Sequence, residues 1–234
     1  MILFLTFSAC EFSSAQISSH RLSAADSLFR AKQYTQSFEQ YQTILAQKQY
    51  SPAMLLKMAY IQEGLNNIGM AMYYLNLYFL ASNDKSVLRK METMASKYNL
   101  GGYDTSDTDT FLSFYHDYHF YISIFLAAAC CLVWSVIFYV KTKNRRPIAS
   151  GVLMAILVIV FLVHINYGER IKTGIVALPN TYIMEGPSAG APVYEIIDEG
   201  HRVEILGPQD VWLKVRWDGE TAYIKNTNVL PVEF

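Results

Sequence analysis

Cysteine is scarce in this sequence, which has three in 234 residues, namely Cys10, Cys130 and Cys131. Cys10 lies in the apolar start of the chain, while Cys130 and Cys131 are neighbours inside a long apolar run. No Cys-x-x-Cys pair is present, so the sequence predicts neither a disulfide framework nor a zinc site built on cysteine. Any folded part of the chain must therefore be stabilised by packing alone.

The sequence also has no excess of positive charge. Its 19 Lys and Arg are balanced by 20 Asp and Glu, which gives a net charge of −1. Without a basic patch or a reading motif, there is no reason to expect nucleic acid as a partner. Motifs such as GxSxG, HExxH and the P-loop are absent, and the five histidines are scattered among segments. We therefore expect no enzyme activity, no catalytic residue and no cofactor.

Charged residues are absent altogether from two long runs, residues 120–140 and residues 148–167. A helix of either length spans roughly 30 Å, the thickness of a bilayer's hydrocarbon core. Two buried core helices are the alternative, but a core helix is rarely apolar on every side over five or six turns. The runs therefore predict two transmembrane helices, with the membrane lipid bilayer as a partner.

The densest positive charge lies between these runs, in residues 141–147, KTKNRRP. Its cations, Lys141, Lys143, Arg145 and Arg146, predict a cytoplasmic loop, because such loops are enriched in Lys and Arg. Residues 100–119, before the first run, carry four Asp and no Lys or Arg. We therefore expect both large polar segments to lie outside the cytoplasm.

The start of the chain fits an exported protein. Residues 1–15, MILFLTFSACEFSSA, are apolar and then small, which predicts a signal peptide cleaved after Ala15. The stretch FSAC also resembles a lipoprotein box, so lipidation at Cys10 stays open as the alternative.

Residues 20–100 show apolar residues at helical spacing in two segments that superimpose with a shift of 34 residues. Tyr34 and Ile68 then align as the starts of the second helices. The small side chains at Ala25, Ser37, Ala59 and Ala71 should let the paired helices approach closely. This pattern resembles the tetratricopeptide repeat, a helical hairpin that stacks into a solenoid. A third helical pattern, from about Asp84 to a stop at Gly101, predicts a capping helix.

The resemblance to tetratricopeptide repeats implies a concave face, lined by the first helix of each hairpin, for an extended peptide or a partner's tail. On this chain that face would present Asp26, Phe29, Arg30, Leu56, Tyr60 and Glu63. Ordinary solvated helix faces are the alternative interpretation.

Residues 101–119 change from Gly and Asp to aromatics, which are typical of a membrane interface, and they predict a linker. His116 and His119, three residues apart, could share a helix face there, with Asp117 between them in the sequence. They make an incomplete metal site without further ligands, so we expect no metal.

Residues 174–234 have the alternation and tight turns of strands, including Asp218-Gly219. The alternation predicts Val215 and Trp217 on one face, with Trp212 and Lys214 on the other. The segment resembles a bacterial SH3 domain, a five-stranded barrel, through MEGPS (184–188), Trp212 with Val215, and Ala222-Tyr223-Ile224. The resemblance implies a ligand surface at Tyr182, Trp212 and Tyr223. Met184-Glu185 stands where the family commonly has arginine, which weakens the case for cell-wall binding.

The predicted fold class is thus a multidomain membrane protein with all-α repeats, a two-helix transmembrane hairpin and an all-β SH3-like barrel. This order resembles the exported repeat/SH3 proteins of bacterial aerotolerance (Bat) operons. The resemblance implies an inner-membrane, periplasm-facing scaffold in an envelope stress complex. Membrane proteins with von Willebrand factor A domains would be its partners, and the hairpin would tether two binding modules. A sensor or anchor that binds peptidoglycan through the SH3-like domain is the alternative.

Overall fold

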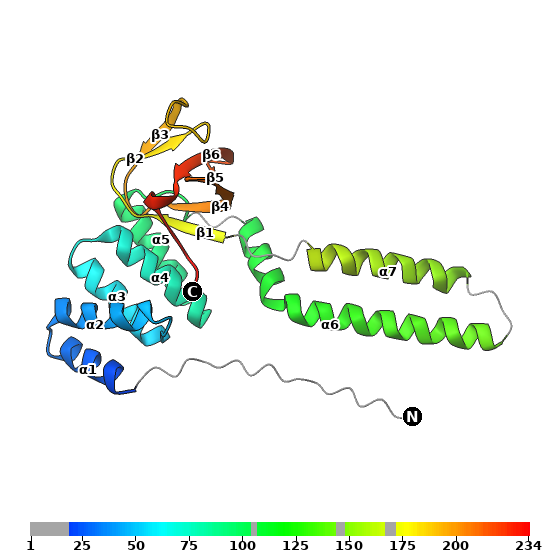
Figure 1. Ribbon diagram of the computed structural model, residues 1–234. Helices are drawn as coiled ribbons and strands as arrows, with labels where there is room; N and C mark the ends of the chain where they lie inside the picture. Colours follow the sequence, from blue (N-terminus) through cyan, green and yellow to red (C-terminus); the bar gives the residue numbers. More distant parts are fainter. Residues whose placement is uncertain (1–18, 104–106, 144–147, 167–171) are drawn as a thin grey trace. The chain divides into compact units, whose positions relative to one another are not determined.

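A computed structural model describes residues 19–103, 107–143, 148–166 and 172–234. These residues contain seven α-helices and one antiparallel sheet of seven strands (Figure 1). They divide into two units: a compact unit of residues 19–103 and 172–234, and a helical hairpin between them in the sequence. The predicted signal peptide, residues 1–15 with Cys10, lies outside the described residues.

Five short helices make up the N-terminal part of the compact unit. Their bounds are α1 Ser19–Arg30, α2 Tyr34–Ala46, α3 Pro52–Gly64, α4 Ile68–Ser82 and α5 Ser86–Tyr98. Helix α3 begins where Ser51 Oγ accepts the Met54 N–H at 3.3 Å and Pro52 occupies the first turn. Lys32, between α1 and α2, and Asn66, between α3 and α4, both have a φ of 61°. The two hairpins therefore repeat in backbone conformation, 34 residues apart.

Small residues let the paired helices approach closely, as predicted. Ala25 and Ser37 are fully buried where α1 meets α2, and Ser37 Oγ donates to the Ala25 carbonyl at 2.9 Å. Ala59 and Ala71 are buried at the matching positions of the second hairpin. The helical pairs are thus confirmed, while their assignment to the tetratricopeptide family stays a prediction.

The third helical element ends earlier than predicted. Helix α5 stops at Tyr98, because Asn99 adopts a left-handed conformation with a φ of 54° and its N–H bonds the Ala95 carbonyl. Gly101, the predicted stop, lies beyond the helix. Near the start, Asp84 Oδ1 accepts the Ser86 N–H at 2.9 Å, as expected of a residue that favours a helix start.

Seven strands follow at the C-terminal end: β1 Lys172–Val176, β2 Thr181–Met184, β3 Val193–Ile197, β4 Arg202–Gln209, β5 Trp212–Trp217, β6 Glu220–Lys225 and β7 Val229–Pro231. Their order in the sheet is β3-β2-β6-β5-β4-β1-β7. The described residues thus form seven strands, where the resemblance implied five. Asp218 and Gly219, both at positive φ, make the predicted turn between β5 and β6.

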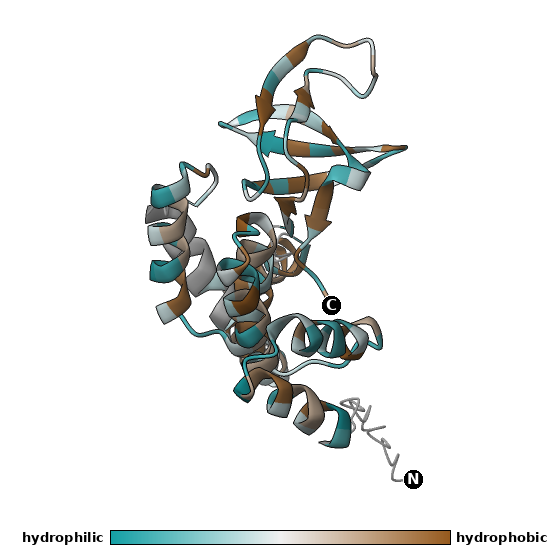
Figure 2. Cartoon of the chain, turned by 90° about the vertical axis from the view of Figure 1, so that its left-hand side faces the viewer, coloured by the Kyte–Doolittle hydropathy of each residue, from teal (hydrophilic) through white to brown (hydrophobic). Residues whose placement is uncertain are grey.

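The alternation along β5 is confirmed. Val215 and Trp217 are buried in the core of the sheet, whereas Trp212 and Lys214 are partly exposed. Along the strands of the sheet, hydrophobic and hydrophilic colours alternate in Figure 2. The bacterial SH3 assignment itself stays a prediction.

The helices and the sheet are joined by the segment that follows α5. Gly101 N–H donates to His201 Nδ1 at 2.8 Å, and Tyr103 Oη donates to the Gly200 carbonyl at 2.8 Å. Arg202 donates from Nε to the Gly102 carbonyl at 2.6 Å and lies over the Tyr103 ring. Burial raises the pKa of Tyr103 well above its usual range, so its hydroxyl remains a donor. Residues 101–103 are therefore part of the compact unit. The sequence had instead predicted a linker over residues 101–119.

The hairpin consists of α6, Asp107–Thr142, and α7, Ile148–Asn166. Tyr118–Thr142 and Ile148–Asn166 are long and apolar enough to cross a membrane, with mean hydropathies of 2.3 and 2.8. Helix α6 begins well before the predicted span 120–140, so most of the predicted linker, residues 101–119, is helical. Lys141 lies in the last turn of α6 and Lys143 directly follows the helix, while Arg145 and Arg146 of the predicted loop lie outside the described residues.

Candidate interaction surfaces

Three aromatic rings meet on the predicted helical face. Phe29 of α1, Tyr34 of α2 and Tyr60 of α3 have ring centroids 5.5–6.0 Å apart in edge-to-face geometry. Tyr60 remains 54% exposed. Phe29 and Tyr60 are predicted site residues, but Tyr34 was seen in the sequence only as a helix start. Its place in this aromatic triad depends on how α2 folds back on α1.

Two predicted acidic site residues are bound within the compact unit. Asp26 Oδ1 accepts the Tyr41 hydroxyl at 2.6 Å and the Lys57 ammonium at 2.7 Å. Burial acts to raise the pKa of Asp26, but the hydrogen bonds from Lys57 and Tyr41 outweigh it and hold that pKa below its usual range. Glu63 pairs with Lys90 of α5 at 2.6 Å. Both carboxylates tie one helix to another, which leaves them less available to a ligand.

The remaining two residues of the predicted face, Arg30 and Leu56, are exposed. Lys57 also lies over the Phe29 ring, 5.8 Å from its centroid. The face that could contact a partner is therefore the aromatic triad flanked by Arg30, Leu56 and Lys57. Its chemistry suits an extended segment that offers apolar side chains and a negative charge.

The predicted surface of the sheet divides into two parts. In the register of β5 and β6, Trp212 lies opposite Lys225 and Lys214 lies opposite Tyr223. Rings and ammonium groups therefore alternate on one face, within reach of each other. Tyr182 instead lies opposite Ile196 in the β2–β3 hairpin, where both side chains are exposed.

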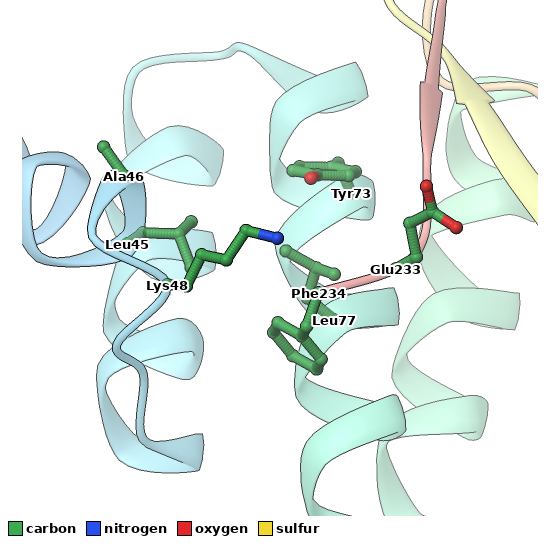
Figure 3. Close-up of a pocket in the computed structure, with 7 residues that line it drawn as sticks. All are labelled: Leu45, Ala46, Lys48, Tyr73, Leu77, Glu233 and Phe234. Carbon is green, nitrogen blue, oxygen red and sulfur yellow. The ribbon is translucent and has the colours of Figure 1, made fainter. Parts of the chain in front are cut away.

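A small cavity lies where the end of the chain meets the helices. Leu45, Ala46, Lys48, Tyr73, Leu77, Glu233 and Phe234 line its volume of about 250 Å³ (Figure 3). Phe234 stacks on Tyr50 with ring centroids 3.6 Å apart, and Lys48 points toward Tyr73 and Phe234. Burial, with help from the Glu233 charge, raises the pKa of Tyr73. Glu233 and Phe234 thus form one wall of this cavity.

Within the hairpin, histidines from the two helices stack. His119 of α6 and His164 of α7 have ring centroids 4.1 Å apart, and His164 is buried. His164 Nδ1 meets the Tyr115 hydroxyl, while its Nε2 lies 3.0 Å from Ser123 Oγ. Ser123 Oγ donates to the His119 carbonyl, which leaves its oxygen able to accept a hydrogen bond from His164 Nε2. The sequence did not pair these residues, because they lie on different helices.

This cluster does not assemble a metal site from the residues that the structure describes. No group of three or more His, Cys, Asp or Glu side chains is close enough among them to hold an ion. The side chains of His116 and Asp117, the other members of the metal motif considered from the sequence, lie outside the described part. The bonds around His164 instead hold α6 against α7, as polar side chains do between membrane helices.

Comparison of the chain with protein-family models, with curated proteins and with solved structures gave no match.

Proposed function

We propose that the protein is a membrane-anchored, non-enzymatic scaffold whose helical and SH3-like modules bind protein partners outside the cytoplasm. The observation that carries this proposal is the aromatic triad on one face of the first helices, in which Tyr60 is 54% exposed and packs against the half-buried rings of Phe29 and Tyr34. Clustered aromatic side chains that remain accessible are the usual anchors of protein interfaces. The candidate spans of the hairpin support the anchoring.

The packing of the two modules changes how such a scaffold would work. The sequence favoured two modules that gain effective concentration by being tethered. Residues 101–103 and 200–202 instead bond the helices to the sheet. A partner would therefore meet one composite surface, whose parts are held in a constant relation, rather than two independent sites.

The partner class follows from the resemblance to aerotolerance-operon proteins: membrane proteins with von Willebrand factor A domains, in an envelope stress complex. Photo-crosslinking in intact cells with a crosslinking residue at position 60 tests this. We expect such a protein to be recovered by mass spectrometry, and Tyr60→Ala to weaken its co-purification. Leu65→Ala is the matched control, because Leu65 is similarly exposed at the end of α3. Loss of co-purification with both variants, or with neither, would contradict a site at the triad.

Binding to peptidoglycan is a second candidate, favoured by the face of Trp212, Lys214, Tyr223 and Lys225. Aromatic rings stack on sugars, and ammonium groups pair with the carboxylates of wall peptides. Pull-down of the detergent-solubilised full chain on purified sacculi tests it, with Trp212→Ala against the control Leu206→Ala. This candidate would be favoured over the scaffold if the chain is retained on the sacculi, if Trp212→Ala abolishes that retention, and if Leu206→Ala does not change it.

A further inference from the structure

Only a short stretch of chain separates the sheet from the second candidate span. Helix α7 ends at Asn166, and β1 begins at Lys172. Six backbone steps join these two residues, and each step covers at most about 3.6 Å, so their Cα atoms lie within roughly 22 Å of each other. If α7 crosses a bilayer, as proposed, the start of β1 cannot leave the neighbourhood of its surface. The inference below rests on that anchoring.

The strand register shows which part of the sheet lies at the start of β1. Strand β1 is antiparallel to β4, with Ile175 opposite Arg202 and Lys172 opposite Ile205. Strand β4 then continues to Gln209, four residues further, which carries it roughly 13 Å past the level of Lys172. The beginning of β1 and the turn between β4 and β5 therefore lie at the same end of the sheet.

This turn exposes a side chain that turn chemistry does not require. Asp210 and Val211 form the two-residue connection, and Asp210 adopts the left-handed conformation, with a φ of 56°. Val211 is β-branched and 48% exposed, whereas Gly, Asn, Asp and Ser are the usual residues of such turns. The Asn226 N–H donates to the Val211 carbonyl at 3.0 Å, which fixes the backbone of the turn. With the partly exposed Trp212 beside it, Val211 forms an apolar tip on a fixed turn.

Three lysines lie at the same end of the sheet as this tip. Lys225 lies opposite Trp212 in the register of β5 and β6, Lys214 lies on the same face of β5 as Trp212, and Lys172 begins β1. None of the three forms an ion pair with a described residue. Asp210 is the one acidic residue of the turn itself. Aliphatic and aromatic side chains next to lysines are the composition that proteins present to an anionic bilayer surface.

We propose that the β4–β5 turn docks on the membrane that anchors the chain, with Val211 and Trp212 in the lipid interface and the three lysines on anionic headgroups. The contact is small, but the short connection to α7 makes docking effectively intramolecular, so little area is needed. Docking would hold the compact unit in one orientation relative to the bilayer. Lipid would then cover Trp212, which the second candidate function assigns to peptidoglycan.

Lipid photo-crosslinking tests this docking. The full chain, with p-benzoylphenylalanine at position 211, is reconstituted into vesicles of phosphatidylcholine with or without phosphatidylglycerol and is irradiated. We expect protein whose mass has increased by one phospholipid, in higher yield from the anionic vesicles. Lys214→Glu combined with Lys225→Glu should lower that yield by roughly tenfold or more, because two attractive charges become repulsive. Raised salt should act in the same direction, through screening.

Leu178 provides the matched control, since it is 49% exposed but follows β1 at the opposite end of the sheet. The photo-crosslinker at position 178 should give no lipid product. An unaltered thermal transition of the double variant excludes misfolding. Alkaline carbonate extraction of the same vesicles reports the anchoring separately, and release of the protein would contradict the anchoring together with the docking that rests on it.

For protein that resists extraction, three results would overturn the docking alone. These are the absence of a lipid product at position 211, an equal yield from position 178, and a yield that neither neutral vesicles nor the double variant reduces. Crosslinking of position 211 to peptidoglycan rather than lipid in intact cells would also overturn it, and would favour the wall-binding candidate.

Discussion

Helices α4 and α7 are both rich in apolar residues, yet they bury opposite kinds of side chain. In α4 the buried residues are largely apolar, among them Ile68, Met72 and Leu75. In α7 the one buried side chain among 19 residues is His164, and most of the large apolar side chains of this helix are exposed, while Met154, Leu157 and Phe161 are partly buried. The compact unit thus has an apolar interior, whereas the hairpin has polar contacts inside and apolar side chains outside.

This difference teaches that hydropathy alone does not decide burial. Helix α4 has 15 residues and meets α3, α5 and β1, so its apolar side chains find partners within the chain. Helix α7 packs along α6, and the rest of its surface needs apolar surroundings, which the proposed bilayer would supply. Four changes, taken from the largest expected effect to the smallest, would break or sharpen this contrast.

The largest effect should come from a cavity in the compact unit. Met58→Ala, at a fully buried position of α3, should lower the free energy of unfolding by about 2–5 kcal/mol. Val160→Ala, on the exposed surface of α7, should change it by no more than about 0.5 kcal/mol. Pulse proteolysis of the detergent-solubilised full chain measures both. Equal effects would mean that the exposed side of α7 is packed against protein.

A smaller loss in the free energy of unfolding should follow from Gly102→Ala. Gly102 has a φ of 83°, and an added Cβ would lie 1.9 Å from the Arg202 carbonyl oxygen, so the backbone must move. We expect a cost of about 1–3 kcal/mol, concentrated at the joint between helices and sheet. Limited proteolysis should then cut near residues 100–104. Gly64→Ala is the control, since nothing lies within 4 Å of its added Cβ; cleavage in both variants would contradict the role of Gly102.

His164→Leu tests the polar interior of the hairpin. It removes the bonds to Tyr115 and Ser123, and we expect a loss of about 0.6–2 kcal/mol in helix pairing. Hydrogen–deuterium exchange in residues 115–123 should become faster. Val163→Leu, one residue away on the exposed side, should leave exchange unchanged. Unchanged exchange in His164→Leu would show that apolar packing alone holds α6 to α7.

The smallest effect should be a pH dependence at the joint. Burial lowers the pKa of His201, with Glu195 and Asp198 acting in the opposite direction, and the neutral ring accepts the Gly101 N–H. This contribution to stability is complete above about pH 6.5, the ordinary value, and is lost as the pH falls through the lower pKa of the folded state. Thermal unfolding between pH 7.5 and about pH 5 should show the loss.

His201→Asn should flatten that pH profile, because an amide oxygen can accept the same N–H without titrating. His20→Asn, at an exposed position of α1, should leave it unchanged. A profile that is equally steep in His201→Asn would assign the pH dependence to another group.

Much of the local structure could be predicted from the sequence, because it depends on neighbours in the chain. The starts of α2 and α4 at Tyr34 and Ile68, and the turn at Asp218-Gly219, follow from periodicity and turn chemistry. The errors lie where a neighbour in space decides. Residues 101–103 bond to the sheet domain, because their hydrogen-bond partners are about 100 residues away. The end of α5 at Asn99 rather than Gly101 is a local exception, since the Asn99 N–H bonds the Ala95 carbonyl.

The candidate surfaces show the same division. Phe29 and Tyr60 were predicted, but Asp26 and Glu63 proved to be tied to Lys57 and Lys90 on other helices. Tyr34 was missed because its side chain reaches the triad only after α2 turns back. Spacing predicts which residues lie on the same face of a helix. It does not reveal which side chain of another helix pairs with them.

By itself, the sequence determined the helical pairs, the alternating strands and the two uncharged runs that need apolar surroundings. These features depend on the period of a helix or strand and on the solvation of side chains, which act over a few residues. Only the tertiary structure decided that helices and sheet form one unit, that His119 stacks on His164, and that the β4–β5 turn lies at the end of the sheet where β1 begins. Each of these depends on hydrogen bonding and packing between segments that the folded backbone alone brings together.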